Sequence, residues 1–136
     1  MDTLFGSDDI KRLSSNDFEI RMNRTLKISH NLSCAILFTD NSQKGMLSFS
    51  IVKSIYTISP CCGIYFINID EDEDFLNEFN NINVNINNEF VKVNFKTEPI
   101  ILIFDKGVPV EIYKGCINRQ TLIHKLLSRC NEETCN

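Results

Sequence analysis

TEPIILIFDKGVPVEIYKG, residues 97–115, holds the clearest structural pattern in the chain. The apolar run 100–104 is followed by the turn Asp105-Lys106-Gly107, and a second apolar segment extends over 110–113. Two apolar segments separated by a short turn that contains glycine are typical of a β-hairpin. The stretch therefore predicts two paired strands that contribute to the core of a sheet.

Two further apolar runs predict central strands. CAILF at 34–38 and IYFINI at 64–69 have strand length and are apolar at nearly every position, which is typical of strands buried on both faces of a sheet. Between them, apolar residues recur at helical spacing from Met46 to Ile55, and Pro60 ends this helix. The order strand, helix, strand indicates an α/β domain.

The segment 10–26 predicts a strand followed by a helix. Residues 10–13 have a short strand pattern, and the residues after them are of types that cap helices: Ser14, Ser15 and Asn16. Three apolar residues then recur at helical spacing, namely Phe18, Met22 and Leu26. We expect these three side chains to form the buried stripe of the first helix.

Five consecutive acidic residues, 70–74, precede a short helical segment at 75–79. Such a run suggests a cation site, but it lacks the alternating ligands and the glycine of a calcium loop. Acidic residues at a helix N-terminus complement the helix dipole, so we expect a helix start and no metal. A last helix is predicted after its capping residue Asn118, with the apolar residues Leu122, Ile123, Leu126 and Leu127.

An asparagine-rich insertion, INVNINNEFVKVNF at 82–95, follows the acidic helix. Apolar and polar residues alternate on both sides of Asn87-Asn88, which predicts a β-hairpin with a two-residue turn. We expect this hairpin, spanning 81–95, to contact a partner protein rather than the core. Its candidate interface residues are Ile82, Val84, Ile86, Val91, Val93 and Phe95.

The chain has 136 residues, enough for a single domain, which we place at about 9–127 with a flexible tail at 128–136. A net charge of −4 gives no basic footprint for nucleic acid. No secretion signal is recognisable, and no apolar run approaches the ~20 residues of a membrane span. We expect a soluble, intracellular, cytoplasmic protein with no membrane contact.

The many Asn, Ile and Phe residues hint at an AT-rich gene, as in protists or large DNA viruses, and a viral origin would make a virion location plausible.

The six cysteines do not form the pairs of pairs that bind zinc. We expect reduced thiols, with Cys34 and Cys116 buried beside apolar strands. Adjacent Cys61 and Cys62 leave a redox role open. The last two, Cys130 and Cys135, fall in the tail.

The order of predicted elements resembles the thioredoxin superfamily over about 9–127. Pro99 stands where the family has its cis-proline, Gly115 matches a glycine after the last strand, and INID at 67–70 matches the end of the third strand. The opening RLSSNDFE at 12–19 looks like the family's first strand and helix entry. The resemblance implies a thioredoxin-like α/β fold: a mixed central sheet flanked by helices, with the hairpin inserted before a cis-Pro99 that faces the turn at 41–45.

The cysteine motif of the redox-active members is missing from this turn. Those members place a thiolate at the N-terminus of the second helix and a resolving cysteine three positions later, and here Ser42 and Gly45 hold these positions. The family's acid, tryptophan and lysine correspond to Thr39, Asn41 and Phe66. We therefore expect Ser42 to be a helix cap and the site to lack a catalytic residue.

The sequence thus favours a redox-inactive thioredoxin-like protein that binds another protein, as a structural or assembly component. We expect no cofactor, and the oligomeric state stays open. The alternative is a thiol–disulfide oxidoreductase that uses non-standard cysteines such as Cys61 and Cys62.

Overall fold

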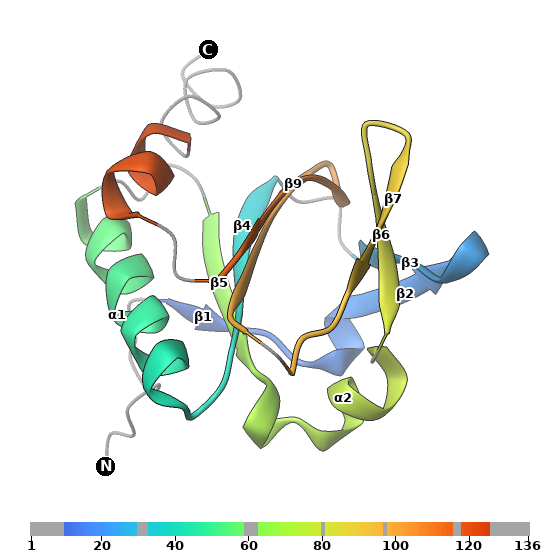
Figure 1. Cartoon of the computed structure of the whole chain (residues 1–136), viewed down its shortest axis with the longest axis horizontal. Coiled ribbons are helices and arrows are strands. Elements are labelled where there is room, and N and C mark those ends of the chain that lie inside the picture. The colour runs from blue at the N-terminus through green and yellow to red at the C-terminus, as the bar shows by residue number, and fades with distance from the viewer. Residues whose placement is uncertain are drawn as a thin grey trace.

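A computed structural model of the chain describes residues 10–29, 33–58, 63–79, 81–96, 98–115 and 118–125. These residues form an α/β fold with two mixed sheets, which confirms the predicted class. The first sheet has five strands in the order β1-β5-β4-β8-β9, and the second has four in the order β2-β3-β6-β7. In Figure 1 the first sheet lies between a layer of helices and the second sheet.

The first sheet contains the apolar runs that predict central strands. Its strands are β1 (Lys11–Arg12), β4 (Cys34–Thr39), β5 (Gly63–Asn68), β8 (Ile100–Asp105) and β9 (Val108–Lys114). β1, β5 and β4 are parallel, whereas β8 is antiparallel to both β4 and β9. All six residues of β4 are buried, because this strand lies in the middle of the sheet with packing on both faces. The predictions for 10–13, 34–38, 64–69 and the hairpin at 100–113 are confirmed.

Helices cover one face of the first sheet. α1 (Gln43–Ile58) and the helix at 119–125 lie on this side (Figure 1). Phe49 and Ile55 of α1 and Leu122 of the last helix share a buried cluster with the sheet residues Leu37 and Ile103. Both helices confirm predictions, although Leu126, Leu127 and the tail lie outside the described residues. None of the helices described is long and apolar enough to cross a membrane.

The opposite face of the first sheet is covered mainly by another sheet, so the expectation of helices on both faces is wrong. The second sheet consists of β2 (Phe18–Arg21), β3 (Thr25–Ile28), β6 (Ile82–Ile86) and β7 (Glu89–Val93). The short helix α2 (Glu73–Phe79) closes the same layer. Between the sheets, the buried rings of five phenylalanines pack with centroids 4.5–5.9 Å apart, namely Phe18, Phe38, Phe75, Phe79 and Phe95.

The predicted first helix is replaced by the antiparallel pair β2 and β3. Ser14 does cap a turn, since its N–H donates to Asp17 Oδ2 at 2.9 Å, but the 3₁₀ turn η1 (Ser15–Asp17) stops at once. Ile20 then pairs with Leu26 across a second 3₁₀ turn, η2 (Met22–Arg24). Met22 is 84% exposed, so it cannot belong to a buried helical stripe. Burial against the phenylalanine cluster outweighs the local capping signal here.

The hairpin at 82–95 has the predicted turn but not the predicted role. Asn87 and Asn88 have φ of 54° and 66°, the left-handed values of a type I′ turn. β3 pairs with β6 in parallel, so the hairpin completes the second sheet. Its side chains therefore help to cover the first sheet and do not project from a finished domain.

Candidate functional site

The turn at 40–42 joins β4 to α1 at the carboxyl ends of the parallel strands, where open α/β sheets place their ligand sites. Ser42 caps α1, because its Oγ accepts a hydrogen bond from the Gly45 N–H at 3.1 Å. The same hydroxyl donates to Asp40 Oδ1 at 2.5 Å, and the Ser42 N–H donates to that oxygen at 3.0 Å. The Ser42 hydroxyl is thus held within its own turn.

Gly45 is buried in the first turn of α1, and its carbonyl accepts a hydrogen bond from Thr39 Oγ1 at 2.7 Å. A Cβ added here would lie 2.8 Å from the backbone nitrogen of Asp40 and would also overlap the carbonyl and carboxylate oxygens of that residue. Two of these three atoms belong to the backbone. Position 45 therefore cannot accept a side chain unless the turn moves.

Hydrogen bonds also join this turn to the end of β5. The Asn41 N–H donates to Asp70 Oδ2, and Asn68 Nδ2 donates to Asn41 Oδ1, both at 2.8 Å. The Asp70 N–H donates in turn to Asn68 Oδ1 at 3.0 Å. Asn68 is 1% exposed. These polar groups satisfy one another, so the turn is a structural junction rather than an open polar site.

The acidic run beyond Asn68 is also structural. It begins in the 3₁₀ turn η3 (Ile69–Glu71) and continues into α2, where Asp72 Oδ1 accepts from the Phe75 N–H at 3.0 Å. Asp72 Oδ2 accepts from the Ser15 N–H at 3.1 Å, and Glu71 pairs with Arg12. This confirms the predicted helix start. Among the residues that the structure describes, no group of His, Cys, Asp or Glu could hold a metal ion.

Pro99 is not a cis-proline. No cis peptide bond occurs among the described residues, which include both Glu98 and Pro99, so the prediction is wrong. The Pro99 carbonyl accepts a hydrogen bond from the Gly115 N–H at 2.8 Å, which continues the pairing of β8 with β9. Because Phe38 pairs with Ile100, Pro99 lies beside the end of β4. An extended residue at the start of a strand needs no cis bond.

The candidate interface residues belong to the core. Ile82, Val84 and Val93 are fully buried and Phe95 is 2% exposed, and all four lie in the phenylalanine cluster between the sheets. Ile86 and Val91 are partly buried against the same cluster. Four of the six side chains are therefore unavailable to a partner, and all six pack on the core, so the prediction that they form an interface rather than core is wrong.

The cysteine predictions are only partly testable. Cys34 is buried in β4, at 5% exposure, as expected. The candidate redox pair, Cys61 and Cys62, lies outside the described residues, as do Cys116, Cys130 and Cys135.

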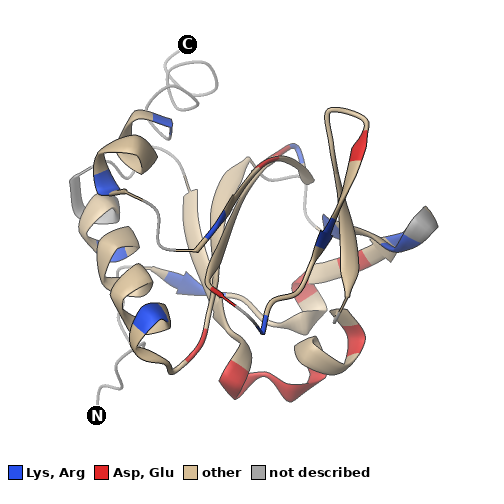
Figure 2. Cartoon of the chain, in the orientation of Figure 1, with Lys and Arg blue, Asp and Glu red and all other residues tan. Residues whose placement is uncertain are grey.

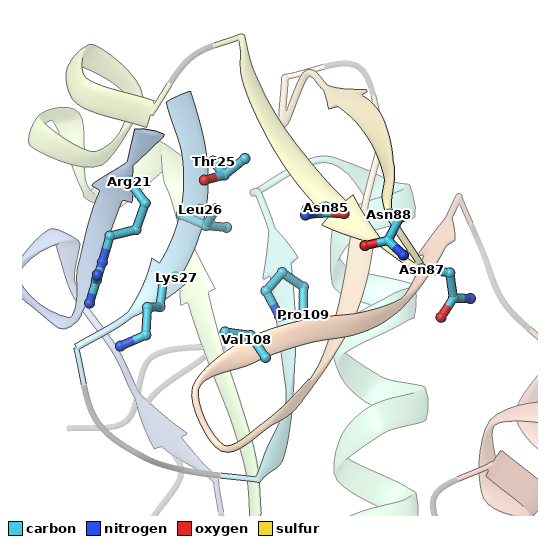
Figure 3. Close-up of a pocket in the computed structure, with 9 residues that line it drawn as sticks. All are labelled: Arg21, Thr25, Leu26, Lys27, Asn85, Asn87, Asn88, Val108 and Pro109. Atoms are coloured by element: carbon cyan, nitrogen blue, oxygen red, sulfur yellow. The ribbon is translucent and has the colours of Figure 1, made fainter. Parts of the chain in front are cut away.

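A groove of about 330 Å³ opens on the second sheet (Figure 3). A single bridge, Thr25 with Asn83, joins β3 to β6. Beyond it the Ile28 N–H donates to the Gly107 carbonyl at 3.1 Å, so β3 turns toward the β8–β9 turn and leaves β6. The gap that β3 leaves beside β6 is the groove. Its lining residues are Arg21, Thr25, Leu26, Lys27, Asn85, Asn87, Asn88, Val108 and Pro109.

The groove has two chemically distinct walls. In Figure 3, Arg21 and Lys27 lie on the β2–β3 side, and the three asparagines lie on the β6–β7 side, with Val108 and Pro109 between them. Lys27 has no ion-pair partner within the described part of the chain. Arg21 Nε donates to Glu19 Oε1 at 3.1 Å, an exposed pair that solvent screens. The acidic residues of η3 and α2 gather at the bottom of Figure 2, away from this groove.

No protein-family model matches the sequence, and no curated protein is significantly similar to it. The groove must therefore be interpreted from its own chemistry. The sequence does not indicate the groove directly, because Arg21 lies in a segment whose apolar spacing predicts a helix and Lys27 directly follows that segment. Had 18–28 been read as two strands, the two-residue period would have placed Arg21, Thr25 and Lys27 on one outward face.

Proposed function

We propose that the chain is a redox-inactive, thioredoxin-like protein that acts by binding another protein, as a structural or assembly component. The fold is supported by the first sheet, in which three parallel strands are followed by an antiparallel hairpin. α1 follows β4, and the last helix packs on the same face as α1. This strand arrangement supports a thioredoxin-like core, whereas the second sheet and the trans Pro99 differ from the expected pattern.

The observation that carries the loss of redox chemistry is the contact between Gly45 and Asp40. A dithiol needs a cysteine at position 45 to resolve a mixed disulfide, and the Asp40 backbone occupies the place of its Cβ. The Ser42 hydroxyl is engaged by Asp40 and by the Gly45 N–H. A turn built around a helix cap, with no room for a side chain at position 45, supports a redox-inactive chain.

The binding role is supported by where apolar side chains reach the surface. The described part of the chain has five exposed large apolar residues: Ile20, Met22, Leu47, Phe90 and Val108. All but Leu47 lie on the second sheet, in its β2–β3 connection or at the groove. Ile20 pairs with the buried Leu26 and so lies on the inner face of this sheet, whereas Phe90 pairs with Asn85 on its outer face. An exposed ring on the outer face supports an interaction surface there. We therefore place the partner on the second sheet.

The catalytic half of the proposal is tested by the reduction of a protein disulfide with dithiothreitol. The full chain should leave the rate of reduction unchanged. A Cys61→Ser/Cys62→Ser double variant is the control. Turnover by the wild-type chain that this variant loses would replace the proposal with the oxidoreductase alternative.

The binding half is tested by recovering partners from the native source with tagged full-length chains. Phe90 and Leu47 form a matched pair, since they are 55% and 54% exposed but lie on β7 and α1. Phe90→Ser should lose the partner, whereas Leu47→Ser should retain it. Equal recovery by both variants would place the interface elsewhere.

A further inference from the structure

We propose that the groove on the second sheet binds an acidic peptide segment, with its carboxylates at Arg21 and Lys27 and its backbone amides at the asparagines. The proposal rests on the proposed function, because it takes the segment to be part of the partner protein. It adds the chemical class of that segment and the residues that recognise it.

The cationic wall selects for carboxylates. Arg21 and Lys27 both line the groove, and so does Thr25, which pairs with Arg21 across β2 and β3. The Thr25 hydroxyl donates to the Met22 carbonyl at 2.9 Å, so toward a ligand it can act as an acceptor. Glu19 engages Arg21 at Nε, which leaves the two terminal nitrogens of the guanidinium for a ligand. The residues that line the groove include two cations and no acid, although Glu19 contacts Arg21 and Glu89 follows Asn88. A carboxylate ligand complements these cations, whereas a basic ligand would be repelled.

The asparagine wall selects for a peptide rather than a simple anion. Carboxamides offer both donors and acceptors, as a peptide backbone requires. The backbone of Asn85 also faces the gap. Because Ile86 and Glu89 flank a two-residue turn, they form the hydrogen-bonded pair of β6 with β7. The N–H and C=O of the preceding residue, Asn85, therefore point away from β7, toward the gap that β3 leaves. An extended peptide in the gap can use them as a strand would.

The shape and the rim agree with this occupant. A volume of about 330 Å³ is at the lower end of ligand sites and suits a short segment of a larger molecule. Leu26, Val108 and Pro109 give apolar contact between the two walls. Phe90 pairs with Asn85 across β6 and β7, which places its exposed ring beside the groove. The expected ligand thus carries an apolar residue next to its acids.

The experiment titrates the ¹⁵N-labelled full chain with the capped peptide acetyl-Asp-Glu-Leu-Asp-Glu-amide and follows amide chemical shifts. Shifts should be confined to residues around 25–27, 85–90 and 108, and binding should weaken at high salt. The neutral analogue acetyl-Asn-Gln-Leu-Asn-Gln-amide should bind at least tenfold more weakly. Glutarate and inorganic phosphate should bind more weakly than the acidic peptide, because neither supplies a backbone.

Variants separate a binding role from a structural one. The Arg21→Gln/Lys27→Gln double variant should lose about tenfold in affinity, since exposed ion pairs contribute up to about fivefold each. The matched control Lys44→Gln, on the opposite face in α1, should bind as wild type does. Asn87→Gly/Asn88→Gly keeps residues that favour positive φ but removes both carboxamides. This variant should weaken binding severalfold while its melting temperature is unchanged or raised.

The proposal is overturned if the neutral peptide binds as well as the acidic one, if the shifts lie elsewhere, or if the cation variant binds normally. Phosphate or glutarate binding as tightly as the peptide would overturn the peptide assignment and leave an anion site. The two proposals can fail separately. Disulfide turnover would defeat the proposed function with the groove intact. A partner recovered by chains that do not bind acidic peptide would defeat only the inference.

Discussion

Single residues decide whether the turn before α1 can do chemistry. Cysteine-to-serine replacement alone would leave a vacant pocket of similar shape. Here Ser42 is a working N-cap and Gly45 packs directly on the Asp40 backbone. Substituting cysteines at positions 42 and 45 would therefore fail to create a dithiol site, because the second side chain has no room.

Gly45→Ala should destabilise the protein by about 1–3 kcal/mol, the usual range for overpacking. The sign of the change in unfolding free energy is informative, because replacing glycine by alanine within a helix ordinarily stabilises a protein by roughly 1 kcal/mol. Urea unfolding followed by circular dichroism measures the change. Ser50→Ala, at an exposed position of the same helix, is the control and should stabilise slightly. If Gly45→Ala also stabilised the protein, the turn would have enough slack to accept a side chain.

Helices and strands with a clear hydrophobic periodicity could be predicted from the sequence. Segments whose secondary structure depends on tertiary packing could not. The apolar patterns alone predict four elements, namely β4, β5, β8 and α1, because each segment is long enough for its periodicity to be recognised. The pair β2–β3 was mistaken for a helix, since Phe18 and Leu26 fit either period and only the packing on Phe75 and Phe79 decides. The groove is composed of four separate segments, so no local motif could indicate it.

The β6–β7 hairpin shows the same limit, because its alternation predicts its form but not what its apolar face covers. Replacing 81–95 with a Gly/Ser linker should abolish cooperative unfolding. Ile82, Val84, Val93 and Phe95 are each at most 2% exposed. Burial of such side chains contributes about 1.5–3 kcal/mol each, so their sum approaches the roughly 5–15 kcal/mol that holds a whole domain. Calorimetry of the shortened chain measures this.

If the linker variant expresses poorly, a single substitution in the same hairpin tests the same prediction. Ile82→Ala should cost about 2–5 kcal/mol, whereas Asn85→Ser on the exposed side of the same strand should stay within roughly 0.5 kcal/mol of wild type. If the linker variant melted cooperatively near the wild-type temperature, the hairpin would be a surface element and not part of the core.

At the scale of the whole molecule, two hydrophobic clusters share one sheet. Successive residues of β4 and β8 point to opposite faces, so Ile36 and Phe38 belong to the cluster between the sheets, and Ala35 and Leu37 belong to the cluster under the helices. Separation of either layer would expose one apolar face of these strands. The second sheet is thus integral to the domain, and it carries most of the residues that line the groove.

This sharing predicts a single unfolding transition that depends equally on both layers. Phe75 is fully buried, and its ring lies within 5.7 Å of those of Phe18, Phe38, Phe79 and Phe95. Phe49 is 5% exposed on the other side, 4.9 Å from Phe66. Phe75→Ala and Phe49→Ala should each cost about 3–5 kcal/mol. By the usual scaling with chain length, each should lower the melting temperature by roughly 10–20 °C.

Differential scanning calorimetry distinguishes the shared-sheet arrangement from two independent layers. Each variant should show one peak whose calorimetric and van't Hoff enthalpies agree, because a domain of this size ordinarily unfolds in one step. If Phe75→Ala instead produced an early partial transition while the Phe49 layer melted at the wild-type temperature, the second sheet would be a separable layer. The groove could then open and close without unfolding the first sheet, which would make its affinity for an acidic segment depend on that local equilibrium.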